Sequence, residues 1–333
     1  MKRVLFIAGL NEEYYYRPFI EACKGKDITV YVFDSSLFPE KATLGIRLEG
    51  SHVSGFIDVI KYGTNDSNKS LENIRLSISE IDIAWHLREN LAKEEKPEAT
   101  LEKRFTDNES IIAVRSFFSV LPCAWINKKE TVNFLSSNKL YQQMVAHQSG
   151  LLTPKTLISN DPTSVLKFSD SDKGLLLKSL GYIKLDDEGK YYLYSQRFTQ
   201  EELEGSTKAI RRCPVFVQEY IDKCCEHRVM VIGDAILSCK IDSQASEKTK
   251  VDWRHYDFEH VAHTASQLPT AVQGALKRFM QKIDLRYGAI DLIETPTHEF
   301  VFLEVNPSGQ WGWIADLAGL PIPKAVAEML ESL

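Results

Sequence analysis

The sequence predicts an α/β protein that folds into more than one domain. Its 333 residues are enough for two or three ordinary domains. Strand-like and helix-like segments alternate in the N-terminal part of the chain, an order that is typical of a parallel sheet covered by helices. Further along, apolar runs come in pairs separated by short turns, which indicates antiparallel hairpins and α+β sub-domains.

The first domain is predicted over residues 1–130. Val4–Ala8 has the pattern of a buried strand, Tyr14–Cys23 that of a helix, and Ile28–Phe33 that of a second strand. Alternation of this kind predicts a parallel sheet. No G-x-G-x-x-G motif follows the first strand, so the sequence does not support a dinucleotide site there.

The second domain is predicted over residues 131–213. Leu140–Gln148 has helical periodicity, with Asn138 placed to cap its start and Gly150 to end it. Two predicted strands follow at Lys155–Ser159 and Gly174–Lys178.

The third domain is predicted over residues 214–333. The dipeptide Gly233-Asp234 is a good hairpin turn and separates the predicted strands Arg228–Gly233 and Ala235–Ile241. Two predicted helices and a second hairpin complete the domain, with the helices at Thr270–Ile283 and Ile322–Leu333.

The second hairpin, over residues 287–307, carries the strongest functional signal. If its turn centres on Thr297 and His298, Asp291 lies directly opposite Glu304, with Cβ atoms about 5 Å apart. Asn306 is two positions beyond Glu304, so both side chains face the same side of the strand.

A single carboxylate in a strand is usually a solvated outer-face residue. Two carboxylates and an amide in register within apolar runs are harder to explain in that way, because two carboxylates this close repel each other without a cation. Hard oxygen ligands suit Mg²⁺, which often completes its shell with substrate phosphates. We therefore predict that Asp291, Glu304 and Asn306 hold Mg²⁺.

Composition excludes several classes of protein. A formal net charge of −6 argues against nucleic acid as the main partner. No apolar run approaches the ~20 residues that cross a bilayer. The short apolar stretch at the N-terminus turns acidic at Glu12 and Glu13, which is unlike a signal peptide. We expect a cytoplasmic protein without a membrane or nucleic-acid partner.

The cysteines and histidines give no metal-binding spacing. The six cysteines include the adjacent pair Cys224-Cys225 but no C-x-x-C pair, which favours reduced thiols over disulfides or a zinc site. The eight histidines show no motif such as H-E-x-x-H, and we interpret them as structural or surface residues.

Several polar residues upstream of the hairpin are candidates for binding a polyphosphate. Lys139 starts a helix, where a cation is unfavourable unless an anion lies nearby, and Lys178 ends a buried-looking strand. The run Gln218-Glu219-Tyr220-Ile221 can present backbone groups to an adenine or serve as a linker. Glu226 and Arg228 share a strand face and can enter one cleft or form a surface ion pair.

The order of these residues resembles the ATP-grasp superfamily over roughly residues 138–320. The resemblance implies a Rossmann-like N-terminal domain, a central α+β domain and a C-terminal ATP-grasp domain. It implies that ATP is bound by Lys139, Lys178, Gln218, Glu219, Tyr220, Ile221, Glu226 and Arg228, with Arg228 near the γ-phosphate. It further implies two Mg²⁺ ions at Asp291, Glu304 and Asn306.

Further segments resemble particular branches of this superfamily. The run Glu226-His227-Arg228-Val229 looks like the branch that contains ribosomal-protein glutamate ligases. Four others resemble the graspetide-forming, microviridin-type maturases: Ala124–Asn127, Val251–Asp257, Pro307–Trp311 and Ala318–Ile322. Those enzymes form ester or amide macrocycles in ribosomally made precursor peptides. The implied partner is a precursor with a leader and a core rich in acidic and hydroxyl residues, and the implied assembly a homodimer.

The implied reaction activates a peptide carboxylate as an acyl phosphate, which a second side chain then attacks. Arg228 supplies bidentate donors to phosphate. Asp252 and Arg254 are candidate catalytic residues that orient the peptide or act on the nucleophile, although a loop salt bridge explains them equally well. An acidic hairpin around Asp186–Glu188 is a candidate for docking the leader.

Two other functions are compatible with the sequence. One is a ligase that adds an amino acid to a protein or small carboxylate. The other is a nucleotide-binding regulator without catalytic activity, against which the intact set of Asp291, Glu304 and Asn306 argues.

Overall fold

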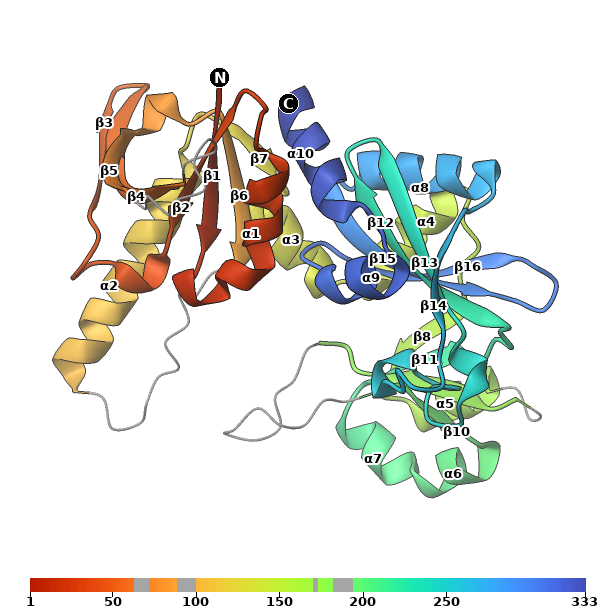
Figure 1. Ribbon diagram of the computed structural model, residues 1–333. Coiled ribbons are helices and arrows are strands. Elements are labelled where there is room, and N and C mark those ends of the chain that lie inside the picture. The colour runs from red at the N-terminus through yellow and green to blue at the C-terminus, as the bar shows by residue number, and fades with distance from the viewer. Residues whose placement is uncertain (63–71, 89–99, 170–172, 182–193) are drawn as a thin grey trace. The chain divides into compact units, whose positions relative to one another are not determined.

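The two predicted N-terminal strands form the centre of a seven-stranded sheet in the computed structural model (Figure 1), which describes residues 1–62, 72–88, 100–169, 173–181 and 194–333. Strands β1 (Lys2–Ala8) and β2 (Ile28–Phe33) are almost wholly buried and pair in parallel. β6 (Ile83–Arg88) and β7 (Ala124–Ile126) extend the parallel part.

A strand that is apolar on both faces needs a cover on both. Helix α1 (Glu13–Ala22) contacts one face, where the Tyr16 ring meets the Phe6 ring edge-on. Helix α2 (Leu101–Ser119) contributes Phe117 to the core on the other face.

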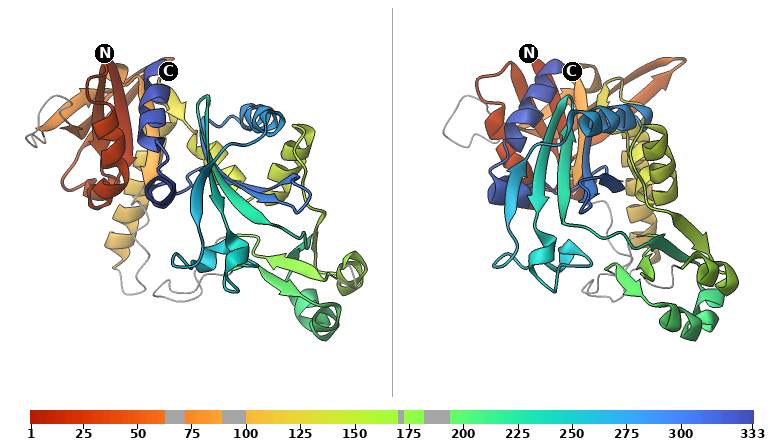
Figure 2. Two further views of the ribbon diagram at one scale, coloured as in Figure 1. Left: turned by 45° about the vertical axis from the view of Figure 1, so that its right-hand side comes forward. Right: turned by 90° about the vertical axis from the view of Figure 1, so that its right-hand side faces the viewer.

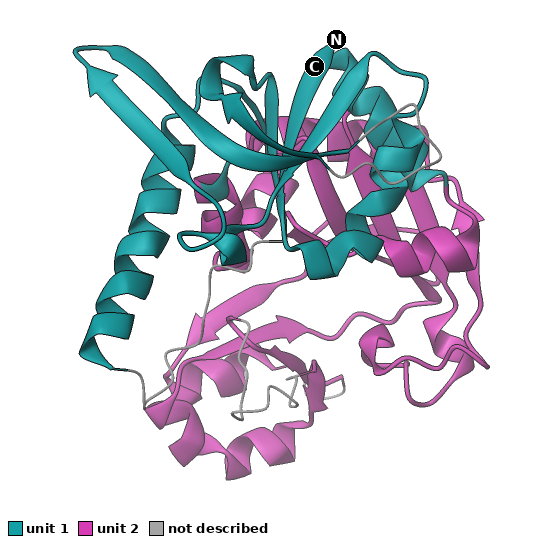
Figure 3. Ribbon diagram, turned by 60° about the vertical axis from the view of Figure 1, so that its left-hand side comes forward, with its two compact units in different colours: residues 1–129, 321–333 teal, residues 130–320 magenta. Residues whose placement is uncertain are grey.

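The rest of this sheet is antiparallel, which the sequence did not predict. β4 (His52–Tyr62) pairs with β2, and β3 (Leu44–Glu49) and β5 (Glu72–Ser77) both pair with β4. The C-terminal helix α10 (Ile322–Ser332) contacts α1. These elements make up one compact unit, residues 1–129 with 321–333, and residues 130–320 form a second (Figure 3).

The second unit contains two antiparallel sheets. The smaller has the order β10-β9-β11-β8. Its strands are β8 (Thr156–Ser159), β9 (Leu175–Lys178), β10 (Gln196–Phe198) and β11 (Val215–Glu219). Three short helices pack their apolar residues against it: α5 (Pro162–Phe168), α6 (Gln200–Gly205) and α7 (Thr207–Arg212). The predicted acidic hairpin at Asp186–Glu188 lies outside the described residues.

The larger sheet of the second unit has the order β14-β13-β12-β15-β16. Its strands are β12 (Cys225–Ile232), β13 (Ala235–Ile241), β14 (His263–Ser266), β15 (Tyr287–Glu294) and β16 (Phe300–Asn306). Helices α4 (Lys139–Gln148) and α8 (Thr270–Lys282) share a hydrophobic core with one side of it (Figure 2). Two further helices are α3 (Lys129–Ser136) and α9 (Gly312–Ala318).

Alternation along the strands separates a core face of the larger sheet from a polar face. Val229, Ile290 and Phe302 belong to the core shared with α4 and α8. Their sequence neighbours therefore point to the opposite face, which is where the predicted metal ligands lie.

Local details test the predicted helix ends and turn. Gly150 has a φ of +90° and follows α4, and Gly233 has a φ of +56° in the β12–β13 turn, as predicted. Asn138 occupies the N-cap position of α4, as predicted, but its side chain makes no capping hydrogen bond, and its amide donates to the carbonyl oxygen of Phe134 at 2.6 Å. All six cysteines are free. Among the described helices, none combines the length and apolar character needed to cross a membrane.

Candidate active site

The predicted opposition of two carboxylates across the β15–β16 hairpin is confirmed, because Asp291 pairs with Glu304. The route to this register differs from the predicted two-residue turn. Residues 295–299 form the loop, and Leu292 pairs with Phe302, so Leu303 is an extra residue in β16. This β-bulge restores the alignment of Glu304 with Asp291.

Arg228 extends the pair into a row of three charged side chains across adjacent strands. It pairs with Asp291 from β12, and its Nη1 donates to both carboxylate oxygens at 3.0 Å. Burial raises the pKa of Asp291, Glu304 raises it further, and Arg228 opposes both. The Asp291 carboxylate therefore lies where additional positive charge would stabilise its ionised form.

Two lysines surround Glu304. Lys139 Nζ lies 2.9 Å from Glu304 Oε2. Burial tends to raise the pKa of Glu304, but Lys139 and Lys178 outweigh it and hold the value at about 2. Burial lowers the pKa of Lys178 to about 8, although Glu304 partly offsets this. Glu304 is thus a permanent anion between two cations from different elements.

Gln142 fixes the helix that carries Lys139. Its amide donates to the carbonyl oxygens of Val305 at 3.1 Å and Leu135 at 2.9 Å, and its Oε1 accepts from the Val305 N–H at 2.8 Å. These buried contacts attach α4 to β16 beside Glu304. Sequence reasoning missed this residue, although a glutamine on the apolar face of a predicted helix was an available signal.

Arg254 is held by Asp252. Its Nε donates to Asp252 Oδ1 at 2.8 Å, its Nη2 contacts Oδ2, and Asp252 also accepts from the Ser195 N–H at 3.0 Å. Burial raises the pKa of Asp252, but Arg254 outweighs it and holds the pKa well below its usual range. Asp252 is therefore an ionised anchor for the guanidinium.

A cavity of about 630 Å³ brings four of the predicted residues together: Lys139, Arg254, Glu304 and Asn306. Tyr194, Tyr256 and Gln310 also line it, and sequence reasoning missed all three. A smaller neighbouring cavity of about 30 Å³ adds Lys178 to Lys139, Arg254 and Glu304. Glu304 therefore shares the smaller cavity with three cationic side chains.

Five of the residues predicted to bind ATP lie elsewhere in the second unit. The amide of Gln218 donates to Thr156 Oγ1 at 3.1 Å, whereas its buried Oε1 has no hydrogen-bond partner among the described residues. Three of the others make local contacts. Glu219 accepts from the Lys155 N–H at 2.8 Å, the Tyr220 ring lies 4.2 Å under the Arg197 guanidinium, and Glu226 forms an ion pair with Lys223 at 2.6 Å. The fifth, Ile221, is half-buried. None of these five residues lines either of the two cavities, and Arg228 and Asp291 do not line them either.

Gly309 packs behind the charged row. A Cβ placed there would meet Ala289 Cβ and would lie 2.7 Å from Arg228 Nη2. The Gly309 carbonyl oxygen accepts from Tyr287 Oη at 2.9 Å. This close approach explains why a glycine follows Pro307-Ser308.

The residues present fit Mg²⁺ and a polyphosphate. Two carboxylates and the exposed Asn306 amide supply hard oxygen ligands, and the repulsion that raises the pKa of Asp291 is the kind a divalent cation removes. Lys139, Lys178 and Arg254 supply positive charge around the cavities.

No protein-family model matches the chain, and no curated protein matches it. Solved structures match over its whole length. A RiPP-associated ATP-grasp ligase from Chryseobacterium gregarium, in complex with ADP and a leader and core peptide, matches with a TM-score of 0.85 and 22% identity. The match covers 99% of this chain and 96% of that one.

Two macrocyclases from Microcystis aeruginosa match in the same way. MdnC, bound with the precursor peptide MdnA, has a TM-score of 0.79 and 24% identity, and covers 99% of this chain and 100% of its own. MdnB has a TM-score of 0.74 and 25% identity, and the match covers 99% of each chain.

The chain therefore has the ATP-grasp fold, and the predicted fold class is confirmed. More narrowly, its whole-chain fold is that of the ATP-grasp ligases associated with ribosomally made peptides, as the resemblance in sequence implied.

Proposed function

We propose that this chain is an ATP-dependent ligase that forms ester or amide macrocycles in a ribosomally made precursor peptide. The observation that carries the proposal is the row of Arg228, Asp291 and Glu304 with Lys139 and Lys178 around Glu304. This row combines hard ligands for Mg²⁺ with cations for phosphate. The nucleotide complexes among the structural neighbours support ATP as the cosubstrate.

The first step transfers a phosphoryl group. A peptide carboxylate oxygen attacks the γ-phosphorus of ATP, the bond to the β-phosphate oxygen breaks, and ADP leaves with that electron pair. Mg²⁺ held by Asp291, Glu304 and Asn306 would neutralise charge on the phosphates. The chain itself contributes Lys139, Lys178 and Arg228 as hydrogen-bond donors to the phosphate oxygens, and these contacts position the γ-phosphate for in-line attack.

The second step releases phosphate. A hydroxyl or amine of the same peptide attacks the acyl carbon, the bond to the phosphate oxygen breaks, and the nucleophile's proton leaves with solvent or phosphate. Arg254 faces the cavity and stays charged, because Asp252 raises the pKa of its guanidinium against the effect of burial. We assign it to the substrate carboxylate, with Asp252 as its positioning residue.

The remaining parts of the proposal concern the adenosine contacts, the number of metal ions, the domains, the location and the binding partners. We propose adenine contacts at Gln218, Glu219, Tyr220 and Ile221 and a ribose contact at Glu226, with two Mg²⁺ ions in total. We further propose the three domains 1–130, 131–213 and 214–333, a cytoplasmic location, and a homodimer as the assembly. The peptide complexes among the neighbours support a precursor with leader and core as the partner.

Mass spectrometry of a candidate precursor tests the proposal. The precursor, with clustered Thr, Ser, Asp and Glu residues, is incubated with the protein and Mg-ATP. We expect loss of one water for each ring and one ADP for each water lost. A mass gain equal to an added amino acid would instead identify the amino-acid ligase, and no ADP release would identify the silent regulator.

Asn306→Ala tests the metal assignment, and Ser308→Ala is its matched control. It removes one proposed Mg²⁺ ligand from the end of β16 and should abolish ring formation. Ser308→Ala, two residues away and also exposed, should retain it. Ring formation by Asn306→Ala would overturn the metal assignment.

A further inference from the structure

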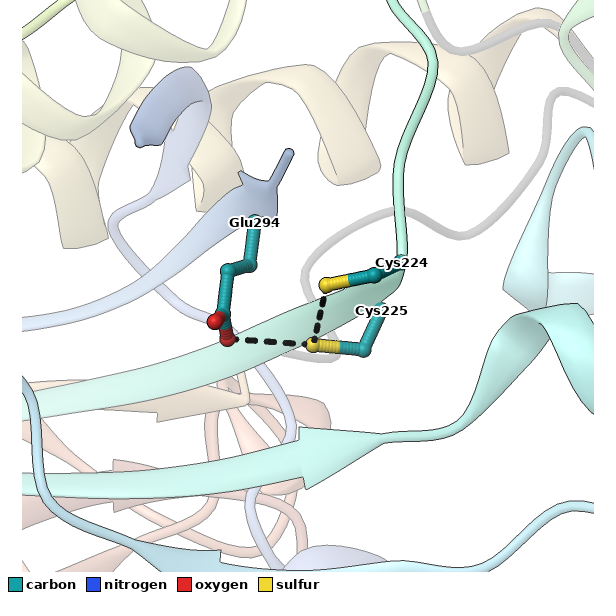
Figure 4. A group of neighbouring side chains, drawn as sticks. All are labelled: Cys224, Cys225 and Glu294. Atoms are coloured by element: carbon teal, nitrogen blue, oxygen red, sulfur yellow. Dashed lines mark hydrogen bonds between the residues drawn. The ribbon is translucent and has the colours of Figure 1, made fainter. Parts of the chain in front are cut away.

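A second group of metal-ligating side chains lies where β12 begins and β15 ends (Figure 4). Cys225 pairs directly with Glu294, and Cys224 precedes Cys225 in the chain. One ligand atom from each of these three residues lies within 4.8 Å of the others. His227 joins them from the next position on the same strand face, with its Nε2 at 2.8 Å from Glu294 Oε2.

This cluster is separate from the Arg228–Asp291–Glu304 row. Residues that pair directly share a face, and alternate residues along a strand do too. Cys225, His227 and Glu294 therefore point to the core face of the sheet. Glu226 and Arg228, between and beyond them, point to the opposite face.

The separations that involve the sulfurs are close to those of a tetrahedral zinc site, and the 2.8 Å between His227 Nε2 and Glu294 Oε2 would lengthen to about 3.4 Å when both bind the ion. Zinc bonds are about 2.3 Å long to sulfur and about 2.0–2.1 Å long to nitrogen or oxygen. In a tetrahedral site, two sulfur ligands therefore lie about 3.8 Å apart, and a sulfur lies about 3.5 Å from a nitrogen or oxygen ligand. The two Sγ atoms are 3.8 Å apart. Cys225 Sγ lies 3.6 Å from His227 Nε2 and 3.2 Å from Glu294 Oε2.

The candidate ligands are oriented by partners outside the cluster. His227 Nδ1 lies 3.2 Å from Ser238 Oγ and 3.3 Å from Ser266 Oγ, which leaves Nε2 directed at the cluster. Glu294 Oε1 lies 2.7 Å from His298 Nδ1. Outer partners of this kind fix the ring orientation and basicity of metal-bound histidines.

We propose that Cys224, Cys225 and Glu294, with His227 in the fourth position, bind one Zn²⁺ ion. Sequence spacing argued against a zinc site because the two cysteines are adjacent rather than two positions apart. The ligands instead come from two strands that the fold pairs. The site ends the linker between β11 and β12, residues 220–224, so the ion would fix the point at which β12 begins.

Burial and the neighbouring carboxylate raise the pKa of the Cys225 thiol in the absence of a cation. Zinc binding would release that proton and replace the thiol–carboxylate contact with two metal bonds. Cys224 and Glu294 are partly exposed, which leaves an entry path for the ion.

Cobalt titration of the full chain tests the proposal. The protein is prepared without an affinity tag, reduced, stripped with a chelator, and titrated with Co²⁺. We expect one Co²⁺ per chain with thiolate-to-metal charge-transfer absorption, which Zn²⁺ then displaces. Cys225→Ser and Glu294→Gln should weaken Zn²⁺ binding at least tenfold, and Ser266→Ala should weaken it by about tenfold through His227.

Cys239→Ser is the matched control, because this buried cysteine lies on the neighbouring strand outside the cluster, and it should bind Zn²⁺ like the wild type. Absence of the charge-transfer band in the wild type would overturn the proposal. So would a Cys224–Cys225 disulfide formed without metal uptake, or unchanged binding by Cys224→Ser. If Cys225→Ser fails to fold, the wild-type spectrum and the half-buried Cys224→Ser variant still decide. Nucleotide binding is measured separately and does not enter these readouts.

Discussion

Lys178 is the clearest case of a residue whose properties come from the fold. Its sequence context shows only a lysine at the end of an apolar strand. In the folded unit it shares a small cavity with Lys139, Arg254 and Glu304, and burial lowers its pKa to about 8. Its charge is therefore half lost at about pH 8, and an anion bound nearby would restore it.

The affinity for Mg-ATP should fall as pH rises above 8. The folded pKa of Lys178 lies below its ordinary value, so the ammonium form is present below about pH 7 and is lost as pH rises through 8. A phosphate needs the ammonium form, so binding takes up a proton above pH 8. Affinity should fall by at most about tenfold per pH unit there. Calorimetric titrations from pH 7 to 9.5 measure this dependence.

Lys178→Arg is the matched variant, because arginine stays charged throughout this range. Its affinity should change much less between pH 8 and 9.5. Equal slopes for wild type and variant would show that Lys178 does not contact the phosphates.

Gly309 should not tolerate alanine. The added Cβ would meet Ala289 and Arg228 Nη2, so the charged row or the segment after β16 must shift. We expect a loss of about 1–3 kcal/mol in the free energy of unfolding and a larger loss of activity. Denaturant titration and ADP release measure the two effects.

The control for this substitution is Gly312→Ala, where a Cβ would meet nothing within 4 Å. It lies at the start of α9, and alanine favours helices over glycine by up to about 1 kcal/mol. Stability should therefore be unchanged or slightly higher. A Gly309→Ala variant as stable and active as Gly312→Ala would contradict the proposed contact.

At the scale of elements, apolar patterning predicted many of the buried strands and helices, although it did not predict the buried strand β6. β2 and β12 are buried along their whole lengths, and both were recognisable as continuous or alternating apolar runs. β3 was not, because four of its six residues are exposed and its pattern is correspondingly weak. Patterning fixes which residues are buried but not which strands pair, so the antiparallel ribbon of β3, β4 and β5 needed the structure.

Some contacts of the candidate site were predictable from the sequence, and others were not. The opposition of Asp291 and Glu304 follows from hairpin pairing and was predictable. The pairing of Arg228 with Asp291 depends on β12 lying next to β15. The two residues are 63 positions apart in the sequence. Contacts between distant segments, such as Gln142 with Val305, leave no periodic signal.

Gln142→Ala should detach α4 from β16. The variant loses two donated hydrogen bonds and one accepted bond, and leaves buried backbone groups of Val305 unpaired. Each such group costs about 1–3 kcal/mol, so we expect a loss of about 2–5 kcal/mol in the free energy of unfolding. Nucleotide affinity should fall as well, because Lys139 is one turn away on the same helix.

Gln148→Ala controls for the loss of a glutamine from α4, because this side chain is exposed at the end of the helix. Its stability should stay within about 0.5 kcal/mol of the wild type. Urea unfolding of both variants makes the comparison. Similar stabilities would mean that the Gln142 contacts do not hold the helix in place.

At the scale of the whole molecule, the chain contains two units with separate hydrophobic cores. One core lies between the seven-stranded sheet and α2, and another lies between the five-stranded sheet and helices α4 and α8. All residues of the candidate active site belong to the second unit. Nucleotide binding should therefore act first on the stability of that unit.

Hydrogen exchange with Mg-ADP tests this expectation. A ligand present at 100 times its Kd stabilises the state that binds it by about 2.7 kcal/mol. Amide protection should increase in β12, β15 and β16, and β1 and β2 should change little. ADP with a chelator is the control, and it should give a smaller effect because Mg²⁺ is withheld. Equal protection of β1 and β15 would contradict the separation of the two units.

The bulge at Leu303 has a consequence for how such sites can vary. Because Leu303 is an extra residue, a chain that lacks it can still align its glutamate with Asp291 and keep the same side of the strand toward the cavity. We therefore expect β16 to accept a one-residue deletion here, whereas an insertion beyond Glu304 would turn Asn306 away from the ligands. The number of residues between the aspartate and the glutamate is thus a poor signature of this site. The identity of the paired residues is the better one.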